Sequence, residues 1–328
     1  MKISIALCTY NGEKYLKQQI NSFISQTRIP DELIVCDDGS KDGTVDILEE
    51  FQKNAPFCVT LEINEKNLGT RKNYEKAISL CKGDIIALSD QDDIWSPTKL
   101  KRIEELFLIN PGIGAIFSNA EVVNANLFST GNLLWDLVGL TKKRQHMIQT
   151  GKAIKAFIQF LYVTGSTLAF KSIYWELIKP IPDYWMHDAW IVLQLAILSE
   201  MKIISEPLIQ YRQHNNNQIG VRKKSIIEKY HETLAIDHKK YYSEELFRYK
   251  AALYRMKDYA KNSKLTIKNY DYKVELLKCK INHVQKRANL PKNRILRLPF
   301  LFMSLIKLEY IYYTWGWEVA VRDLLITR

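Results

Sequence analysis

The segment Asp84-Ile-Ile-Ala-Leu-Ser89 has the pattern of a buried β-strand, and it runs directly into Asp90-Gln-Asp92-Asp93-Ile-Trp95. Three carboxylates within four positions repel one another, so a folded protein usually places a cation between them. Hard oxygen ligands at a strand end suit Mg²⁺ or Mn²⁺, and these ions commonly hold a diphosphate as well. A solvated acidic turn is the alternative that this segment alone leaves open.

The same succession of strand and polar end recurs through the first part of the chain. Ser96 and Pro97 are residue types expected at the N-cap and the first position of a helix. Strand–helix alternation predicts an α/β fold with a mostly parallel sheet flanked by helices. We expect strands at residues 2–9, 32–37, 58–63, 84–89 and 114–118, and helices at residues 13–26, 42–51 and 70–81.

Polar clusters follow four of the expected strands. In open α/β sheets, ligands bind beyond the carboxyl ends of the strands, and these ends share one edge. The sequence therefore predicts a ligand site at that edge. The clusters are Thr9-Tyr10-Asn11-Gly12, Asp37-Asp38-Gly39-Ser40, Asn67-Leu68-Gly69 and residues 90–93.

The later segments give weaker patterns. Residues 124–149 lack clear periodicity, and we expect a flexible loop or lid there. Residues 164–167 and 187–190 form a second polar and aromatic region, and residues 211–217 end the front part. Residues 225–328 are predicted to be mainly helical, with apolar side chains at a and d spacing at Val274, Leu277, Ile281 and Val284.

Composition is that of an ordinary globular protein. Of the 328 residues, 47% are hydrophobic and 25% charged, and the length allows one large domain with a smaller appendage. The five cysteines form no Cys-x-x-Cys pair, which predicts a reduced, intracellular protein without a disulfide framework or zinc site. No signal peptide pattern is visible. No apolar run approaches the roughly 18 to 20 residues that a membrane span needs.

The order and spacing of the clusters resemble inverting glycosyltransferases of family 2, which have the Rossmann-like GT-A fold. The resemblance covers residues 2–220 and implies a nucleotide-sugar transferase domain at residues 1–220. The motifs that carry it are Ala6-Leu-Cys-Thr-Tyr-Asn11, Val35-Cys-Asp-Asp-Gly-Ser-Lys-Asp42, Asn67-Leu-Gly69 and Ser89-Asp-Gln-Asp-Asp-Ile-Trp95. Three later motifs resemble the bacterial rhamnosyltransferase-like branch, namely Thr164-Gly-Ser166, His187-Asp-Ala-Trp190 and Tyr211-Arg-Gln-His214.

The resemblance implies a donor-nucleotide site built by the first clusters. Asp38 would accept a hydrogen bond from the pyrimidine base or the ribose, and Thr9, Tyr10 and Asn11 would frame the base. Arg71 would help hold the diphosphate, unless it is a solvated cation at a helix start. A turn with a helix cap is the alternative for the Asp38 segment, since Asp, Gly and Ser favour such positions.

A divalent metal, Mn²⁺ or Mg²⁺, is implied by the same resemblance. Asp92 is the first candidate ligand, and Asp90 would bind the ribose or the metal. Asp93 would lie next to these carboxylates without binding the metal directly. A divalent ion would offset the charge that develops on a nucleoside diphosphate leaving group. His214 would complete the metal site or contact the diphosphate, although a lone histidine is often structural. Arg212 would pair with phosphate or lie along the surface.

The catalytic base implied by the resemblance is Asp188. Its carboxylate would take the proton of an acceptor hydroxyl as that oxygen attacks the anomeric carbon, and one displacement inverts the configuration. Trp190 would be a platform for the acceptor sugar, and His187 and Gly165 would line the acceptor site. The alternative for this segment is a helix start capped by Asp188.

The predicted function is a metal-dependent inverting transferase that uses dTDP-L-rhamnose to extend a cell-surface polysaccharide or lipid-linked oligosaccharide. The chain lacks the Gln-x-x-Arg-Trp motif of processive members, which favours addition of a single sugar per encounter. It also lacks Gly-x-Gly-x-x-Gly and Walker A sequences, which disfavours dehydrogenases and P-loop enzymes. The alternatives are a UDP-hexose or galactosyl transferase of the same fold, or a catalytically silent scaffold at the membrane.

Residues 221–328 form a basic, mainly helical region. They hold 24 Lys and Arg and 11 Asp and Glu, a balance of +13, while residues 1–220 hold 23 and 25. Aromatic residues between Phe300 and Trp317, with Arg294, Arg297 and Lys307 beside them, suit a membrane headgroup interface. We therefore expect a cytoplasmic protein, peripheral on the inner leaflet of the cell membrane. A homodimer face is the alternative, and no nucleic acid motif accompanies the charge.

Overall fold

The computed structural model describes residues 1–161, 163–214, 228, 237–263 and 266–326. The chain forms two compact units. The first unit comprises Met1–Gly151, Tyr162–Ile181 and Met186–Val221, and the second comprises Lys152–Leu161, Pro182–Trp185 and Arg222–Arg328. Two short segments from the front of the sequence therefore group with the C-terminal helices.

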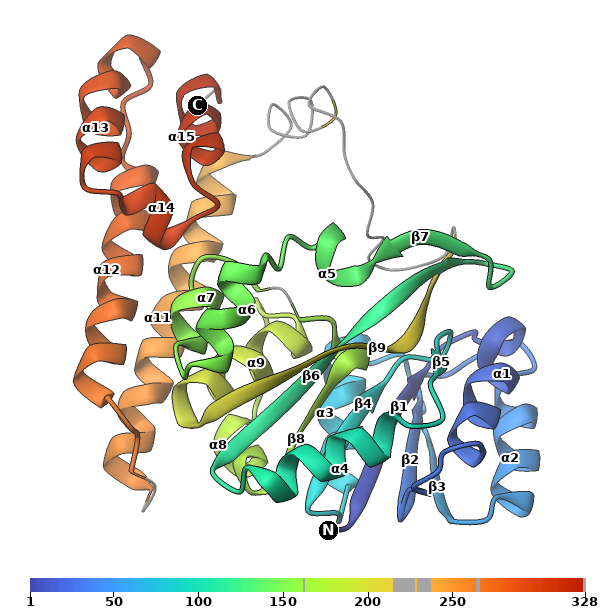
Figure 1. Cartoon of the computed structure of the whole chain (residues 1–328). Helices are drawn as coiled ribbons and strands as arrows, with labels where there is room; N and C mark the ends of the chain where they lie inside the picture. The colour runs from blue at the N-terminus through green and yellow to red at the C-terminus, as the bar shows by residue number, and fades with distance from the viewer. Residues whose placement is uncertain (162, 215–227, 229–236, 264–265, 327–328) are drawn as a thin grey trace. The chain divides into compact units, whose positions relative to one another are not determined.

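A mixed, mostly parallel sheet forms the centre of the first unit (Figure 1). Its parallel part has the order β3-β2-β1-β4, with the register Leu7↔Ser89 between β1 and β4. β8 joins antiparallel to β4 and β6, β9 runs parallel to β6, and β5 and β7 pair antiparallel to β9 and β6. The strands are β1 (Ile3–Thr9), β2 (Glu32–Asp37), β3 (Cys58–Ile63), β4 (Ile85–Ser89), β5 (Ile94–Trp95), β6 (Ile113–Asn124), β7 (Ser129–Leu133), β8 (Leu168–Lys171) and β9 (Glu200–Gln213).

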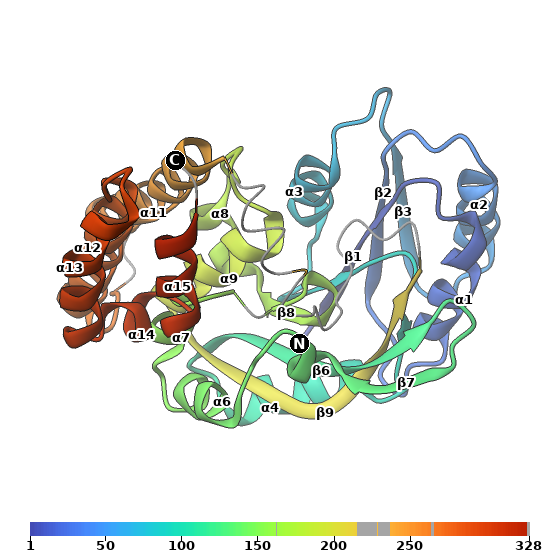
Figure 2. The ribbon, with the colours of Figure 1, turned by 90° about the horizontal axis from the view of Figure 1, so that it is seen from above.

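Helices cover both faces of the parallel strands, with α1 and α2 on one face and α3 on the other (Figure 2). α1 buries Leu16, Ile20 and Phe23 at helical spacing, whereas α9 is apolar nearly all round and almost entirely buried. The helices of this unit are α1 (Glu13–Ile24), α2 (Thr44–Asn54), α3 (Thr70–Leu80), α4 (Lys99–Ile109), α5 (Leu134–Leu137), α6 (Lys142–Gln149), α8 (Trp175–Ile178) and α9 (His187–Leu198), with 3₁₀ turns at Gly165–Thr167 and Ser172–Tyr174.

The expected α/β fold is confirmed, and the first four strands begin and end within one residue of the predicted bounds. Two expectations are wrong. The helix after the acidic segment starts at Lys99 with Thr98 at its N-cap, not at Ser96 and Pro97. Residues 124–149 are not a loop, because they contain β7, α5 and α6, and Leu134 and Ile148 are buried.

The second unit is a set of helices. α11 (His238–Asn262) and α12 (Tyr270–Ala288) pack side by side (Figure 1), and α12 buries Val274, Leu277 and Val284 as the a and d spacing predicts. α13 (Arg294–Ile306), α14 (Glu309–Tyr313) and α15 (Trp317–Leu325) follow, and α7 (Ala153–Phe157) belongs to the same unit. In the part of the chain that the structure describes, none of the helices is long and apolar enough to cross a membrane.

Candidate active site

A cavity of about 1180 Å³ opens in the first unit, beyond the carboxyl ends of β1, β2 and β4. This is the edge at which the polar clusters were expected to meet. Asn67, Gly69 and Gln213 also line it. The predicted site residues that line it are Thr9, Tyr10, Asn11, Asp38, Asp90, Asp92, Gly165, His187, Asp188 and His214.

Three carboxylates lie together after the end of β4. The hydroxyl of Tyr74 donates a hydrogen bond of 2.6 Å to Asp90 Oδ1. Burial, together with the charge of Asp92, raises the pKa of Asp90 to about 6. Burial and the neighbouring charges of Asp92 and Asp90 also raise the pKa of Asp93 well above its ordinary value. This mutual repulsion costs free energy in the folded state, and a cation placed among the carboxylates would reduce it.

Lys99 lies behind these acids at the start of α4 and is fully buried. Its Nζ donates to the Ser166 carbonyl at 2.8 Å and lies 3.4 Å from the centre of the Trp95 ring. Burial lowers the pKa of Lys99, and the charges of Asp93 and Asp90 partly oppose that decrease. The ammonium thus attracts the acids without being hydrogen-bonded to them, and the carboxylates that line the cavity can accept another cation.

Asp92 and His214 form a pair at the cavity wall, with Oδ2 of Asp92 2.9 Å from Nε2 of His214. Tyr15 stacks on the imidazole, with ring centroids 4.7 Å apart. Arg212 fixes the end of β9 against the acidic segment, because its Nε donates to the Asp92 carbonyl at 2.7 Å and its backbone N–H donates to Asp93 Oδ1 at 3.1 Å. Arg212 is therefore buried and structural in this arrangement, and does not lie on the surface.

The Asp92–His214 pair fits one way of holding a divalent ion. Within the described ranges, no three or more His, Cys, Asp or Glu side chains are arranged as a metal cage. Mg²⁺ typically takes only one or two carboxylates and fills its other positions with water and substrate phosphates. Asp92 would supply one such carboxylate and a diphosphate would supply further oxygens, while the His214 Nε2 is within hydrogen-bond distance of Asp92.

Asp37 and Asp38 have separate contacts after β2. Asp37 is buried and accepts a 2.8 Å hydrogen bond from Thr9 Oγ1, which ties the ends of β1 and β2 together. Asp38 accepts hydrogen bonds from the backbone N–H groups of Leu68 at 2.7 Å and Gly69 at 2.8 Å. Gly69 has a φ of +78°, a conformation that favours glycine. Asp38 thus holds the loop after β3 at the cavity in addition to lining it.

Tyr10 and Asn11 form the rim after β1. The side-chain amide of Gln91 accepts from the Tyr10 N–H at 2.8 Å and donates to the Tyr10 carbonyl at 3.1 Å, which joins the ends of β1 and β4. Asn11 has a φ of +49° and accepts a 2.8 Å hydrogen bond from the Lys41 N–H. The Tyr10 side chain itself is exposed at the cavity.

His187 and Asp188 lie at the start of α9. The His187 ring is 5% exposed and stacks on Tyr74, with centroids 3.9 Å apart, and neither ring nitrogen has a hydrogen-bond partner among the described residues. Burial lowers the pKa of His187, although Asp188 opposes this, so the ring is neutral near pH 7. A Cβ at Gly165 would lie 2.9 Å from His187 Nε2, so only glycine leaves space there.

Two predicted site residues are not among those that line the cavity. Trp190 is fully buried and its Nε1 donates to the Ile178 carbonyl at 2.9 Å, so the prediction of an acceptor platform is wrong. The ring sits one helical turn into α9, where all sides are packed. Arg71 is partly exposed next to the cavity-lining Thr70, and its Nη1 donates to the Ile181 carbonyl at 2.9 Å. Its contact with a diphosphate stays a prediction. The asparagines at 215–217 lie outside the described residues.

Sequence reasoning missed Tyr15, Tyr74 and Gln91, which hold His214, Asp90 and Tyr10 respectively. Tyr15 and Tyr74 sit on expected helices, where an aromatic residue is usually assigned to the core. Gln91 carried a usable signal, since it lies inside the acidic segment itself.

Comparison with known proteins shows the family of the chain. A sequence profile described as "Glycosyl transferase family 2" matches residues 4–169, about half of the chain. The chain belongs to glycosyltransferase family 2. The prediction of a glycosyltransferase is thereby confirmed at the level of the family.

Two relatives each match about two thirds of this chain. An uncharacterized glycosyltransferase of Nostoc sp. is 30% identical over 221 residues, 66% of this chain and 66% of the relative. A dTDP-rhamnosyl transferase of Shigella flexneri is 28% identical over 231 residues, 65% of this chain and 73% of the relative. The matches thus span about two thirds to three quarters of these relatives.

Solved structures confirm the GT-A fold of this family 2 member. Staphylococcus aureus TarS 1–349, solved with UDP-GlcNAc, has a TM-score of 0.55 at 16% identity, covering 87% of this chain and 72% of that one. The mannosyltransferase PcManGT of Pyrobaculum calidifontis, solved with GDP-Man and Mn²⁺, has a TM-score of 0.53 at 14% identity, covering 93% of this chain and 75% of that one.

Proposed function

We propose that this family 2 member is a metal-dependent inverting glycosyltransferase that moves one sugar from a nucleoside diphosphate to an acceptor hydroxyl. The observation that carries the proposal is a single cavity lined both by the Asp92–His214 pair and by Asp188. The first two supply donor atoms for a metal-bound diphosphate, and the third supplies a base. One displacement reaction needs both functions in the same cavity.

Asp188 is the proposed base. Its carboxylate takes the proton of the acceptor hydroxyl while that oxygen forms a bond to the anomeric carbon. The bond from the anomeric carbon to the diphosphate oxygen breaks on the opposite side, so the configuration inverts and a nucleoside diphosphate leaves. A positioned base is worth roughly 10²- to 10⁴-fold in rate, because a sugar hydroxyl is a poor nucleophile.

The donor site is assigned to residues after β1, β2 and β4. Asp38 accepts from the base or the ribose, with Thr9, Tyr10 and Asn11 around the base, and Asp90 contacts the ribose. Asp92 and His214 would hold Mn²⁺ or Mg²⁺, which would offset the negative charge of the departing diphosphate. The loop after β3, whose Leu68 and Gly69 N–H groups donate to Asp38, lies at the same cavity.

Two donors are favoured by particular relatives. dTDP-L-rhamnose is the first candidate, because the Shigella flexneri relative is a dTDP-rhamnosyl transferase and matches most of the same region. A UDP-hexose is the second candidate, because a UDP-Glc-dependent glucosyltransferase of Escherichia coli is 34% identical over 124 residues. Uracil and thymine differ by one methyl group, so a direct comparison of the two nucleotides separates these candidates.

The acceptor site is assigned to His187 and Gly165, beside Asp188. Both residues line the cavity beside Asp188, and the absence of a side chain at Gly165 leaves the room that the His187 ring occupies. We propose a glycan or lipid-linked oligosaccharide of the cell surface as the acceptor, which places the reaction at the cytoplasmic face of the membrane.

A donor and acceptor panel tests the function. Purified protein with Mn²⁺ is incubated with dTDP-L-rhamnose, UDP-glucose, UDP-GlcNAc or GDP-mannose and a set of alkyl glycosides. Nucleoside diphosphate release is measured, and NMR gives the anomeric configuration of the product. The proposal expects an inverted product from one pyrimidine donor, lost on chelation of the metal. A product of retained configuration would contradict it, and absence of transfer with every donor would favour the scaffold alternative.

A further inference from the structure

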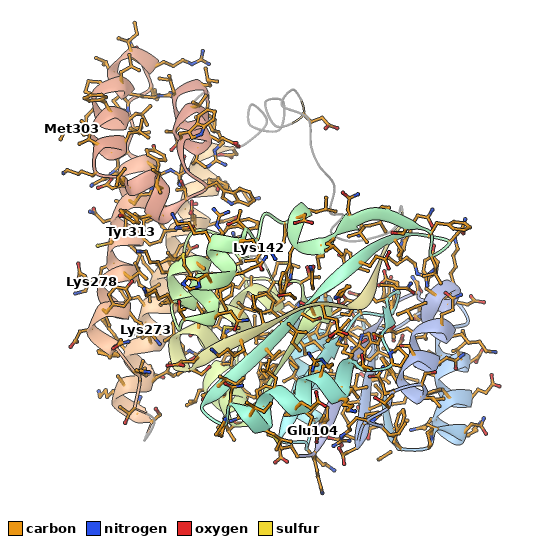
Figure 3. All side chains as sticks on the ribbon, in the orientation of Figure 1. Glu104, Lys142, Lys273, Lys278, Met303 and Tyr313 are labelled. Carbon is orange, nitrogen blue, oxygen red and sulfur yellow. The ribbon has the colours of Figure 1, made fainter. Side chains whose placement is uncertain are left out.

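The outward face of α13 in the second unit is apolar. Six of its side chains have exposed fractions between 51% and 72%, and Met303 is seen projecting away from the helix in Figure 3. A surface helix of a water-soluble protein usually points such residues into the core and charged residues outward. α13 buries Arg297 and Leu301 but leaves apolar side chains exposed over much of its remaining surface. The six side chains are Ile295, Leu296, Phe300, Phe302, Met303 and Ile306.

The inward face of α13 explains how the helix is held without burying those residues. Arg297 is 1% exposed. Its guanidinium donates to backbone carbonyls just before α13 and at the C-terminal end of α15. The partners include Pro291 at 2.7 Å, Asp323 at 3.0 Å and Ile326 at 2.7 Å. A charged donor thus caps the end of α15 and anchors α13 to it. The expectation that Arg297 flanks an exposed interface is therefore wrong.

The apolar surface continues onto α14 and the start of α15. Ile311 is 50% exposed, Trp315 43% and Trp317 67%, while Tyr310 is buried and donates to Asp323 instead of reaching the surface. Large exposed apolar side chains on helices that contact one another indicate an interaction surface. Its aromatic members have the amphipathic rings that favour a membrane interface.

The charges beside this surface are mainly positive. Lys292, Arg294 and Lys307 are exposed on or next to α13. Among the acids, Glu309 is paired with Lys286 at 2.6 Å, and Glu318 is exposed in the first turn of α15. Residues 221–328 carry a balance of +13. A second copy would bring the same positive rim against itself, which costs free energy. An anionic surface complements it, and basic side chains each add to binding there.

We propose that the outward surface of α13, α14 and the first turn of α15 docks on an anionic lipid bilayer. α13 has 13 residues, fewer than the roughly 20 that a span needs, so it lies in the plane of the headgroups. Phe300, Phe302, Met303 and Trp317 enter the boundary between headgroups and acyl chains. Docking involves none of the cavity residues, so the inference goes beyond the proposed function and does not depend on it.

Vesicle sedimentation with the full chain tests this proposal without any nucleotide sugar. Vesicles of phosphatidylcholine alone are compared with vesicles that contain 30% phosphatidylglycerol in this design (roughly the range in which surface charge matters). We expect binding to the anionic vesicles, weakened in high salt because the charges are screened. The double variant Phe300→Ser/Phe302→Ser should reduce the partition coefficient by at least about tenfold.

Matched variants isolate the surface. Leu108→Ser/Ile109→Ser changes two exposed apolar residues of α4, 62% and 76% exposed, and should leave binding unchanged. Lys292→Glu/Arg294→Glu should reduce binding about tenfold or more. Lys142→Glu/Lys143→Glu, at exposed positions of α6 (Lys142 is labelled in Figure 3), should not. All these side chains are exposed, so thermal melting should show each variant folded.

Three results would overturn the proposal. In the first, the wild-type protein stays in the supernatant with both vesicle types. In the second, Phe300→Ser/Phe302→Ser binds as well as the wild type and as the control Leu108→Ser/Ile109→Ser. Light scattering could also show a dimer that Phe300→Ser/Phe302→Ser converts to a monomer, with no vesicle binding by either, and the surface would then be a homodimer face. None of these results would alter nucleotide binding at the cavity, which is measured separately.

Discussion

Each of the two units contains buried carboxylates, but the neighbouring charges differ. The carboxylates of the first unit lie next to other acids, whereas that of the helical unit lies next to a cation. After β4, Asp90, Asp92 and Asp93 lie next to one another, and burial with mutual repulsion raises the pKa of Asp90 to about 6. In the helical unit, Asp323 is fully buried but accepts hydrogen bonds from Arg287 Nε at 2.6 Å and Tyr242 Oη at 2.6 Å. Burial would raise the pKa of Asp323, yet the charges of Arg287 and Arg322 and the hydrogen bonds from Arg287 and Tyr242 together lower it.

The difference separates a structural cluster from a ligand site. Asp323 has a cation and hydroxyl donors from its own chain, so its charge is satisfied in the folded protein. The acids after β4 have a buried lysine nearby that donates its hydrogen bond to a carbonyl. Natural proteins retain such under-compensated acids at functional sites. Substitutions should therefore affect activity at one cluster and stability at the other.

The largest expected effect is on turnover. Asp188→Asn keeps the shape of the side chain but removes the base, so kcat/KM should fall roughly 10²- to 10⁴-fold. The melting temperature should change little. The measurement is nucleoside diphosphate release under saturating metal. Asp136→Asn, an exposed acid in the first turn of α5, is the matched control and should keep full activity. Equal activity in both variants would remove Asp188 from the mechanism.

The second effect is on stability in the helical unit. Asp323→Asn removes the nearest acidic partner of the buried Arg287 and leaves it with Glu245 at 3.7 Å, so the free energy of unfolding should fall by about 3 to 5 kcal/mol. Urea unfolding followed by circular dichroism measures it. Asp271→Asn, an exposed acid in the first turn of α12, should cost at most about 1 kcal/mol. A small loss for Asp323→Asn would show that its network is not structural.

The third prediction is an increase, not a decrease, in the free energy of unfolding. Asp90→Asn removes a carboxylate whose pKa is raised, while the amide oxygen can still accept from Tyr74. Without metal at pH 7, the free energy of unfolding should therefore rise by on the order of 2 kcal/mol. The same variant should lose activity. Thermal and urea unfolding with chelator give the result, and a destabilised Asp90→Asn protein would break the contrast between the clusters.

The smallest effect is a dependence on pH. A raised acid pKa stabilises the folded state below the unfolded pKa of about 4, and this stabilisation is lost as pH rises through about 6. The gain from Asp90→Asn should therefore vanish near pH 4 and grow up to pH 7. The lowered pKa of Asp323 acts in reverse, so the cost of Asp323→Asn should shrink as pH falls below about 4. Unfolding at several pH values checks both trends.

Local sequence was sufficient for the parallel strands and the cavity edge, because apolar runs with polar ends carry that information directly. It was insufficient where a side chain's role depends on distant partners. Trp190 was predicted to be functional from its position, but it is fully buried and donates to the Ile178 carbonyl. Arg297 and Tyr310 looked like interface residues, but buried partners in α15 hold them. Residues 124–149 lacked periodicity because their elements are short and bury few side chains.

The central claim is that Asp92 and His214, with a divalent ion, hold a nucleoside diphosphate. Its most direct test is the melting temperature of wild type and Asp92→Asn with dTDP, UDP, GDP or ADP, each with Mn²⁺ or with chelator. A ligand at 100 times its Kd adds about 2.7 kcal/mol to stability. The account predicts a rise for one pyrimidine nucleotide in wild type that needs Mn²⁺ and is lost in Asp92→Asn. A rise that persists with chelator or in Asp92→Asn would contradict it, as would no rise with any nucleotide.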